Sequence, residues 1–358
     1  MVELDDRMAL VAWADVEGAG PRTLARLRAR LGGLAQAWYA SAPVLVSQGG
    51  FTPERANALV RARDARDPVR LWQRHLASGL DLVLDTDARF PDLLRHIPVP
   101  PLALWTAGDL LHQERAIAIV GTRRPTPYGC RVAARLAGEL ASRGVVVVSG
   151  LALGIDAEVH AAALARGRTW AVLGSALDRI HPVSHRDLAR RIVRSGGCLI
   201  SEYPPGTGAA PWRFPARNRL VAGLCRGTVV VEAPERSGAL LTAAHALEQD
   251  REVLGVPGPV DSTASAGVHR LLRDGARLVR DVHDVLMEFG WEASPQGLEK
   301  ALEGDQAAIW AALGPGARPV DVLPALTGLS AARVQAALTH LLLAGRVAMG
   351  AEGWHRLA

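Results

Sequence analysis

The 358-residue sequence contains few cysteines, one lysine and few aromatic residues. The three cysteines, Cys130, Cys198 and Cys225, are far apart and form no C-x-x-C pair. This pattern argues against a disulfide framework and against a cysteine-based structural zinc site. A chain that uses so little cysteine fits a reducing compartment, and we expect it in the cytoplasm.

Long hydrophobic stretches are also lacking. No apolar run approaches the ~20 residues that span a bilayer. The acidic N-terminal residues Met1–Asp6 lack the basic region of a secretory signal. We therefore expect no membrane association. Hydrophobic residues still make up 49% of the chain, which excludes a fully disordered protein, and the length predicts two or three domains.

Lysine is almost absent, because Lys300 is the one lysine among 41 basic residues. We attribute this mainly to the coding bias of a GC-rich gene, although arginine also binds phosphate groups through its planar fork. Residues 108–287 contain 23 arginines and 17 acidic residues, whereas residues 288–358 contain five basic and seven acidic residues. A polyanion should therefore bind to the middle of the chain.

The middle of the sequence repeats a strand–helix unit. Stretches such as Gly129–Ser142 and Asp156–Arg166 are rich in alanine with helical spacing, and they separate apolar runs that begin 24 to 30 residues apart. Runs that are apolar on both faces are typical of a parallel sheet covered by helices. We predict an α/β fold with a doubly wound, Rossmann-like parallel sheet. The six predicted strands are Ala116–Val120, Val145–Ser149, Thr169–Leu173, Cys198–Glu202, Thr228–Glu232 and Glu252–Val256.

The N-terminal residues 1–80 predict a helical segment. Gly18-Ala19-Gly20 forms a Gly-x-Gly turn before a helix that has Leu24, Leu27 and Leu31 on one face. Such a turn fits a helix-hairpin-helix, whose amides hold a DNA phosphate, but a plain packing corner between two helices fits it better.

The C-terminal residues 298–358 follow a predicted linker at Gly290–Gly297. Three helices and a hairpin are the pattern of a winged helix, although the last helix has Arg333 as its one fixed cation and the segment is net acidic. We therefore favour a structural or protein-contact role for this segment. The predicted elements are helices near Glu303–Leu313, Val320–Leu326 and Ser330–Ala344, with Ser330 as an N-cap, and strands at Arg346–Met349 and Trp354–Leu357.

Ligands of a doubly wound sheet bind at the carboxyl ends of its strands, and glycine- or serine-rich turns follow several of the predicted strands. Such a turn can hold a phosphate with its backbone amides. One nucleotide needs one or two of these turns, whereas several of them with scattered arginines suit a polynucleotide. The turn Gly121–Gly129 is not G-x-G-x-x-G, so dinucleotide binding is disfavoured. The turns are Gly121–Gly129, Ser149–Asp156, Gly174–Asp178, Ser201–Gly206, Glu232–Thr242 and Pro257–Pro259.

The stretch between Glu202 and Glu232 contains no acidic residue. Arginines for phosphates and aromatic rings for bases are the composition of a single-strand groove, and a solvated basic loop is the alternative. These residues are Arg213, Arg217, Arg219 and Arg226, with Tyr203, Trp212 and Phe214.

Other polar residues argue for structure rather than catalysis. Asp156 and His160 are four residues apart on a predicted helix. We favour the interpretation that Asp156 caps the turn and that His160 forms a hydrogen bond within the core, over the alternative that they belong to an anion site. Asp178, His181 and His185 lack a recognised metal-ligand spacing. The sequence shows no nucleophile–base pair and no Walker Gly-Lys-Ser/Thr, so we expect no enzyme activity, no metal and no cofactor.

Seven short motifs occur in one order over residues 116–280, and through them the sequence resembles the DprA/Smf (DNA processing protein A) family. His181-Pro182 stands where many members have Tyr-Pro, and Gly174-Ser175-Ala176 where many have Gly-x-Gly. The motifs are Val120-Gly121-Thr122-Arg123, Ser149-Gly150-Leu151-Ala152-x-Gly154-Ile155-Asp156-x3-His160, Gly174-x2-Leu177-Asp178, Ser201-Glu202-Tyr203-Pro204, Phe214-Pro215-x-Arg217-Asn218-Arg219, Ser237-Gly238-x3-Thr242 and Val256-Pro257-Gly258.

The resemblance implies a single-stranded DNA-binding protein that protects incoming DNA and loads RecA recombinase on it during natural transformation (competence) and recombination. It also implies a homodimer formed through the Rossmann-like domain, with a single-strand-binding protein as a further candidate partner and no catalytic activity. The implied domains are a helical SAM-like domain (1–80), a Rossmann-like DNA-binding domain (81–287) and a winged-helix-like domain (298–358).

The resemblance also implies the DNA-binding residues. Arg123 is the first expected phosphate contact, and the Arg217-Asn218-Arg219 motif lines or supports the same groove. The full set is Gly121, Thr122, Arg123, Arg124, Gly150, Ala152, Gly154, Gly174, Phe214, Arg217, Asn218, Arg219, Ser237 and Gly238.

Two alternatives stay open from the sequence. Nucleotide phosphoribohydrolases share a related fold, but the stretch Glu235–Thr242 lacks both the Gly-Gly pair and the final glutamate of their motif. The other alternative is duplex DNA binding through the C-terminal winged-helix-like domain.

Overall fold

The computed structural model describes residues 4–110, 115–291, 304–314, 317–343, 347–350 and 353–356. The chain forms two compact units, Met1–Val285 and Leu286–Ala358. The predicted linker at Gly290–Gly297 lies mostly outside the described residues. The predicted division of the first 287 residues at residue 80 stays a prediction.

A nine-stranded sheet forms the centre of the first unit in the part of the chain that the structure describes. The strand order is β1-β2-β6-β5-β4-β3-β7-β8-β9; β3 to β9 pair in parallel, while β2 is antiparallel to β6 and β1 to β2. The doubly wound sheet is confirmed, and β3 to β8 coincide with the six predicted strands to within two residues. The strands are β1 (Asp81–Leu84), β2 (Ala103–Gly108), β3 (Ala116–Val120), β4 (Val146–Ser149), β5 (Thr169–Leu173), β6 (Cys198–Ser201), β7 (Gly227–Val230), β8 (Glu252–Gly255) and β9 (Arg277–Leu278).

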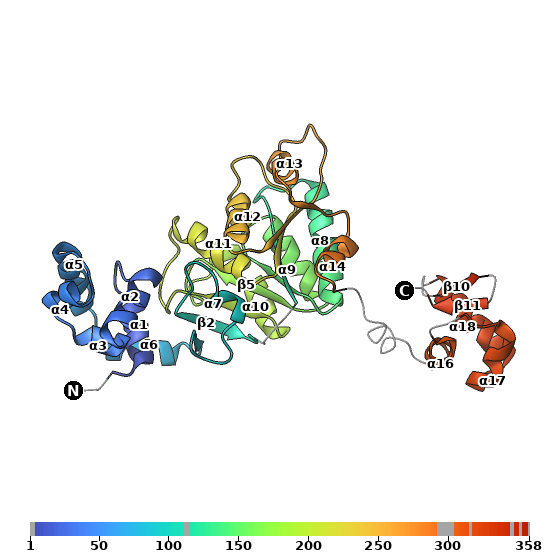
Figure 1. Ribbon diagram of the computed structural model, residues 1–358, viewed down its shortest axis with the longest axis horizontal. Coiled ribbons are helices and arrows are strands. Elements are labelled where there is room, and N and C mark those ends of the chain that lie inside the picture. Colours follow the sequence, from blue (N-terminus) through green and yellow to red (C-terminus); the bar gives the residue numbers. More distant parts are fainter. Residues whose placement is uncertain are drawn as a thin grey trace. The chain divides into compact units, whose positions relative to one another are not determined.

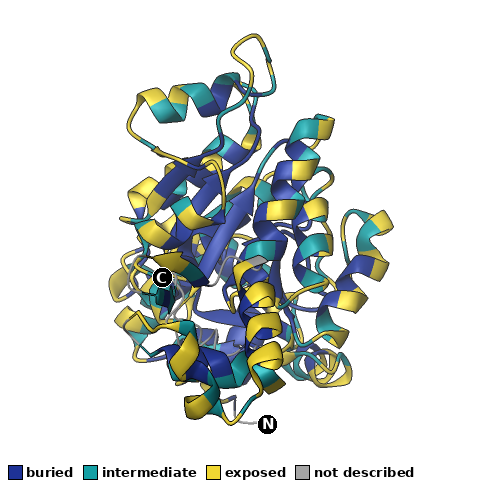
Figure 2. Cartoon of the chain, turned by 90° about the vertical axis from the view of Figure 1, so that its right-hand side faces the viewer, coloured by how far each residue is buried: buried dark blue, intermediate teal, exposed yellow. Residues whose placement is uncertain are grey.

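Helices cover both faces of this sheet (Figure 1). Alternate residues of β5 enter different cores: Leu173 packs with Ile192 of α10, whereas Val172 packs with Leu220 of α11. The strands are therefore buried on both faces, with the exposed surface on the outer sides of the helices (Figure 2). The helices are α7 (Asp92–Arg95), α8 (Pro127–Ser142), α9 (Ile155–Leu164), η1 (Val183–His185), α10 (Arg186–Arg194), α11 (Arg213–Gly223), α12 (Gly238–Glu248), α13 (Ala266–Arg273) and α14 (Val282–Glu288).

The N-terminal segment is helical, as predicted, and packs onto the antiparallel edge of the sheet. Trp13 and Leu27 belong to the same buried cluster as Leu102 and Trp105. The helices are α1 (Asp6–Ala14), α2 (Pro21–Leu31), α3 (Leu34–Tyr39), α4 (Ala42–Ser47), α5 (Pro53–Asp64) and α6 (Pro68–Ala77).

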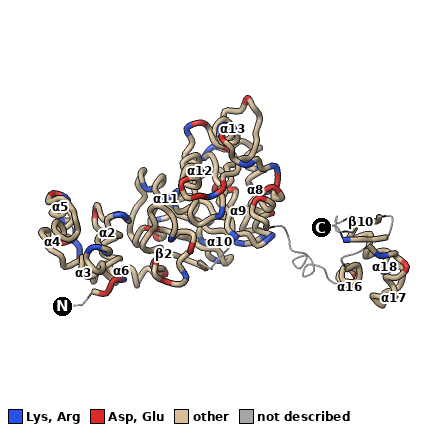
Figure 3. Tube along the Cα trace, viewed as in Figure 1, with Lys and Arg blue, Asp and Glu red and all other residues tan. Residues whose placement is uncertain are grey.

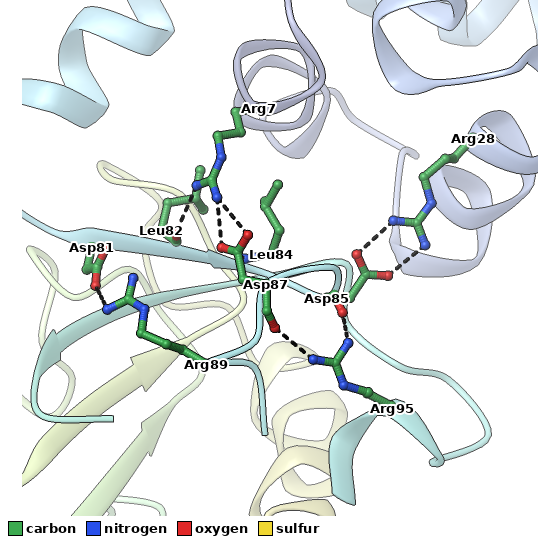
Figure 4. Close-up of polar contacts among 9 residues, drawn as sticks. All are labelled: Arg7, Arg28, Asp81, Leu82, Leu84, Asp85, Asp87, Arg89 and Arg95. Carbon is green, nitrogen blue, oxygen red and sulfur yellow. Dashed lines mark hydrogen bonds and ion pairs between the residues drawn. The ribbon is translucent and has the colours of Figure 1, made fainter. Parts of the chain in front are cut away.

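Two arginine–aspartate pairs fix this edge (Figure 4). Arg7 of α1 donates two hydrogen bonds to the Asp87 carboxylate, at 2.7 and 2.8 Å, and Arg28 of α2 donates to Asp85, at 2.7 and 2.6 Å. The hydrogen bond to Asp85 raises the pKa of Arg28 above its ordinary value. Arg95 of α7 donates to the backbone carbonyls of both aspartates, so the turn after β1 is held from two sides.

The second unit is a small winged helix with its own core. Trp310, Leu338 and Val347 are buried in it, and the predicted helices and hairpin are confirmed. The Ser330 hydroxyl accepts from the Arg333 amide, as predicted for an N-cap, while the Arg333 side chain pairs with Asp305 at 2.5 Å. The elements are α16 (Gly304–Leu313), η2 (Val320–Val322), α17 (Leu323–Thr327), α18 (Ala331–Leu343), β10 (Val347–Gly350) and β11 (Gly353–Arg356).

Across the described ranges of both units, no helix is both long enough and apolar enough to cross a membrane.

Candidate nucleic-acid interface

A cleft of about 590 Å³ opens at the carboxyl ends of the central strands. Its walls come from the turns after β3, β4 and β7 and from the first turns of α11 and α12. The chain leaves β3 for β4 on one side and later places β7 on the other side. This is the point where the strand order reverses, the usual ligand position in a doubly wound sheet. We call it the switch-point cleft.

The turn after β3 carries two exposed arginines, Arg123 and Arg124. The turn itself is fixed, because the Thr122 amide donates to the Glu232 carbonyl at 2.7 Å and the buried Thr122 hydroxyl accepts from the Arg124 amide at 3.2 Å. Neither guanidinium has an ion-pair or hydrogen-bond partner among the described residues. The Arg123 guanidinium lies 5.9 Å from the centre of the Phe214 ring. A cation and an aromatic face are therefore presented side by side.

Two glycines allow this turn to approach its neighbours. A Cβ on Gly121 would lie 2.6 Å from Ile155 Cγ1. Gly154 has a φ of +79°, and a Cβ there would lie 2.5 Å from the Thr122 carbonyl oxygen. Gly154 therefore supports the arginine turn from behind and does not line the cleft.

Two buried residues of opposite charge, Asp156 and Arg217, form the floor of the cleft. The Asp156 carboxylate accepts from the amides of Gly150 and Ala152, at 3.1 and 3.2 Å, and thereby caps the turn after β4. Arg217 donates to the carbonyls of Gly150 and Val172. Burial raises the pKa of Asp156, against the opposing effect of Arg217, and burial lowers the pKa of Arg217 to about 10. Arg217 thus holds two strand ends together beneath the cleft.

The turn-cap interpretation of Asp156 and the core interpretation of His160 are both confirmed. The His160 ring is fully buried, and its Nδ1 lies 2.7 Å from the Thr169 hydroxyl. Burial lowers the pKa of His160 to about 3, so the ring is neutral in the folded chain.

Helix α11 divides its side chains between this cleft and a second cavity. Phe214 and Asn218 line the cleft, and Asn218 donates to the Gly238 carbonyl at 3.3 Å. Arg219 faces the second cavity and makes a nearly buried ion pair with Glu202, at 2.5 and 2.6 Å. Gly174 lines neither cavity but makes room for Phe214, since a Cβ there would lie 2.9 Å from the Phe214 ring.

The start of α12 closes the cleft opposite the arginine turn. Ser237 is the N-cap, and its hydroxyl accepts from the Ala239 amide at 3.3 Å. The space around Gly238 is open, because nothing lies within 4 Å of a Cβ built there. An uncovered helix N-terminus attracts anions through its free amides and its dipole.

The structure brings most of the predicted residues together. Gly154, Gly174 and Arg219 lie outside the cleft lining, and the other eleven of the fourteen line it. Sequence reasoning missed the exposed Arg236 and also Thr263; the position of Arg236 directly before the Ser-Gly cap was an available signal. The eleven are Gly121, Thr122, Arg123, Arg124, Gly150, Ala152, Phe214, Arg217, Asn218, Ser237 and Gly238.

The charge of this lining is one-sided. Arginines and acidic residues are interspersed over much of the chain (Figure 3). Among the described residues that line the cleft, however, Asp156 is the one acid, and its buried carboxylate already accepts from two amides, whereas three arginines are exposed. The cleft is therefore suited to a phosphate-rich ligand.

The residues considered for a metal have other roles. His185 Nδ1 lies 2.9 Å from the Leu151 carbonyl, Asp178 accepts from the Gly206 amide at 2.9 Å, and the His181 ring lies 5.4 Å from that of Phe214. Within the described ranges, no group of three or more His, Cys, Asp or Glu side chains is arranged to hold a metal.

Comparison with known proteins identifies this architecture. Residues 81–290 match the family model of DNA recombination-mediator protein A, and residues 293–353 match the DprA winged helix domain. The chain is 38% identical over 306 residues to Protein Smf of Synechocystis sp., covering 83% of this chain and 76% of the relative. It is 39% identical over 330 residues to Protein Smf of Escherichia coli, covering 88% and 87%.

Solved structures are also similar to this chain, and two of them have TM-scores above 0.5 with about 30% identity. DNA processing protein A of Streptococcus pneumoniae matches with a TM-score of 0.69 and 29% identity, covering 80% of this chain and 99% of that one. A structure that addresses the single-stranded DNA binding mode of DNA processing protein A from Helicobacter pylori matches with a TM-score of 0.55 and 30% identity, covering 61% and 99%. The chain therefore belongs to the DNA recombination-mediator protein A family.

Proposed function

We propose that this protein binds single-stranded DNA in the switch-point cleft, protects the incoming strand and loads RecA recombinase on it during transformation and recombination. The observation that carries the DNA site is the exposed, unpaired Arg123 beside the Phe214 ring, opposite the uncovered start of α12. Phosphates would contact the arginines and the helix amides, and a base would stack on Phe214.

The stacking of a base on Phe214 predicts a preference for single strands. In a duplex the base faces are stacked on each other and are not free to pack on Phe214. Binding to phosphates releases counterions, so affinity should fall steeply as salt is raised. Sequence readout should be weak, because every base offers a face to an aromatic ring.

We propose that the site performs no catalytic step. The Ser237 hydroxyl caps α12, and the Asp156 carboxylate is held by the amides of Gly150 and Ala152. The Glu232 carboxylate accepts from the amide and the hydroxyl of Thr126. Each of these groups is thus already used by the fold, and none is poised as a nucleophile or general base.

The remaining parts of the proposal rest on family membership. They are the transfer of the strand to RecA, contact with a single-strand-binding protein, a cytoplasmic location, and a homodimer formed through the sheet-containing unit. Two clefts in a dimer would engage one strand together and raise its apparent affinity.

The DNA site is tested by fluorescence anisotropy with a labelled oligo-dT and a matched duplex over a salt series. We expect wild type to prefer the single strand and Arg123→Ala to lose at least tenfold in affinity, because one phosphate contact and its cation–ring pair are removed. Arg131→Ala is the matched control, since Arg131 is also an exposed arginine and lies outside the cleft lining.

Each other outcome corrects a different part of the proposal. Equal losses in the two variants would mean that general charge, not the cleft, determines binding. An unchanged Arg123→Ala variant would move the site elsewhere. A wild type that binds neither DNA would refute the function, and small nucleotides would then be screened.

A further inference from the structure

A second cavity, of about 990 Å³, lies between the α1–α2 turn and the segment that leads into α11. We call it the α1–α2 cavity. Its size is at the upper end of the range for small-molecule sites. The proposed function does not use it, although it adjoins the switch-point cleft across the first turn of α11.

The two cavities share one wall. Phe214 and Pro215 line the cleft, whereas Trp212, Arg213 and Ala216 line the α1–α2 cavity. Residues two apart in a chain are separated by at most about 7.6 Å between Cα atoms. A flexible ligand that leaves the cleft past Phe214 therefore reaches Trp212 within a single helical turn.

The shared wall carries an aromatic platform on its cavity side. Trp212 is 63% exposed. The Arg213 guanidinium lies 4.9 Å from the centre of the Trp212 ring and 4.8 Å from that of Tyr203. Exposed aromatic rings interleaved with arginine are the groups on which unstacked bases bind.

The opposite wall offers a place for phosphate. Helix α2 (Pro21–Leu31) has 11 residues, its N-cap residue Gly20 offers no side-chain cap, and the exposed Arg22 is its second residue. Arg55 donates to the Gly18 carbonyl at 2.5 Å and fixes this turn. The three acids in the lining are Asp15, Glu17 and Glu202; Asp15 pairs with Arg66 and Arg74, and Glu202 pairs with Arg219.

We propose that the α1–α2 cavity binds further nucleotides of the same single strand, with a base stacked on Trp212 and a phosphate near Arg22 at the start of α2. The inference rests on the proposed function, because the strand must first occupy the switch-point cleft. A free nucleotide presents the same chemistry, so the test separates the two sources.

The test compares a short oligonucleotide, dT6, with a long one, dT24, by anisotropy at fixed salt. We expect wild type to bind dT24 more tightly than dT6. Trp212→Ala should lose about tenfold for dT24 and retain its affinity for dT6, and Trp212→Phe should restore most of the loss because a ring remains. Tyr39→Ala, which removes another exposed aromatic outside both linings, is the control.

A second measurement locates the strand directly. An oligonucleotide with 5-iodouracil at single positions is photo-cross-linked and the adducts are mapped by mass spectrometry. We expect adducts at Trp212 or Tyr203 from positions a few nucleotides away from those that give adducts at Phe214. As a control for free nucleotide, dTMP is titrated into wild type and into Trp212→Ala, and binding is followed by tryptophan fluorescence. At the concentrations at which dT24 saturates wild type, we expect little difference in dTMP binding between the two proteins.

Each of the following outcomes would overturn the inference. Trp212→Ala could bind dT24 as wild type does, or it could lose equally for dT6 and dT24, which would make Trp212 a support of the cleft. If dTMP binds tightly and this binding depends on Trp212, while dT6 and dT24 bind with equal affinity, the cavity is a site for free nucleotides. If Arg123→Ala alone weakens binding, the proposed function stands without this inference; if wild type binds neither oligonucleotide, both fail.

Discussion

At the scale of single residues, burial decides which polar groups meet solvent and which serve the fold. Arg123 and Arg217 both belong to motifs that resemble a DNA-binding family, yet one is exposed and the other donates to carbonyls at two strand ends. Arg217 is 6% exposed. A DNA defect after its substitution would therefore report a displaced cleft floor rather than a lost phosphate contact.

His160 gives a residue-scale prediction about pH. Its pKa is lowered to about 3 in the folded chain by burial, whereas a histidine in the unfolded chain titrates near 6.5. Between these values the unfolded chain binds a proton that the folded chain does not, so acid favours unfolding. We expect the free energy of unfolding of wild type to fall more steeply below pH 6 than that of His160→Gln, by up to about 1.4 kcal/mol per pH unit.

The measurement is urea unfolding at a series of pH values between 4 and 7. The two slopes are compared, rather than the absolute stabilities, because Gln also changes the packing around Thr169. Parallel slopes would show that His160 already carries its proton in the folded chain.

At the scale of elements, the sequence predicted the parallel strands well and the sheet edge poorly. Runs such as Ala116–Val120 are apolar at every position because both faces of β3 are buried, and that pattern is visible without a structure. The antiparallel strands β1 and β2 at one side of the sheet were not predicted, because their pairing depends on α1 and α2, which pack there from far along the chain.

The candidate site was also predicted in part. The sequence placed the turns after the strands at the carboxyl ends of the sheet, and eleven of the predicted residues do line the cleft. Which side of α11 faces the cleft could not be assigned, since Arg219 turns to Glu202 and the α1–α2 cavity instead. Arg236 was not predicted, because in that turn only the helix cap formed by Ser237 and Gly238 was considered as an anion site.

The glycines behind the arginine turn give an element-scale prediction. Gly154→Ala places a methyl group 2.5 Å from the Thr122 carbonyl oxygen, at a φ of +79°, so the turn that carries Arg123 must move. Gly144 has a similar φ of +77° but open space around it, so Gly144→Ala has only the backbone cost of about 1 kcal/mol. We expect both variants to lower the melting temperature and only Gly154→Ala to weaken oligo-dT binding.

Circular dichroism melting and anisotropy on the same samples check this prediction. Equal oligo-dT affinities for the two alanine variants would show that the arginine turn tolerates displacement, and the cleft geometry would then have no part in binding.

At the scale of the whole molecule, the two compact units do not share a core. The first unit has a core on each face of the sheet, one of them shared with the N-terminal helices, and the winged helix has its own. Separate cores predict separate unfolding transitions. A chain shortened to residues 1–291 should lose the transition of the second unit and keep the midpoint of the first. It should also keep its affinity for oligo-dT, because the switch-point cleft lies within the first unit.

Calorimetry and anisotropy on the full and the shortened chain test this expectation. Loss of oligo-dT binding in the shortened chain, with the first transition unchanged, would place the DNA site in the winged helix. The ion pair between Arg333 and Asp305 argues against that position for a phosphate contact, because it occupies the one fixed cation of α18.

The switch-point cleft contains guanidinium and amide donors but no primary amine, since none of its described lining residues is a lysine and the chain has only Lys300. Guanidinium groups are always protonated and do not form imines with aldehydes under ordinary conditions. A strand with an abasic site exposes a sugar aldehyde, which would react with a lysine placed at the same depth. This cleft would release such a damaged strand as freely as an intact one, and borohydride reduction should leave no covalent adduct in it.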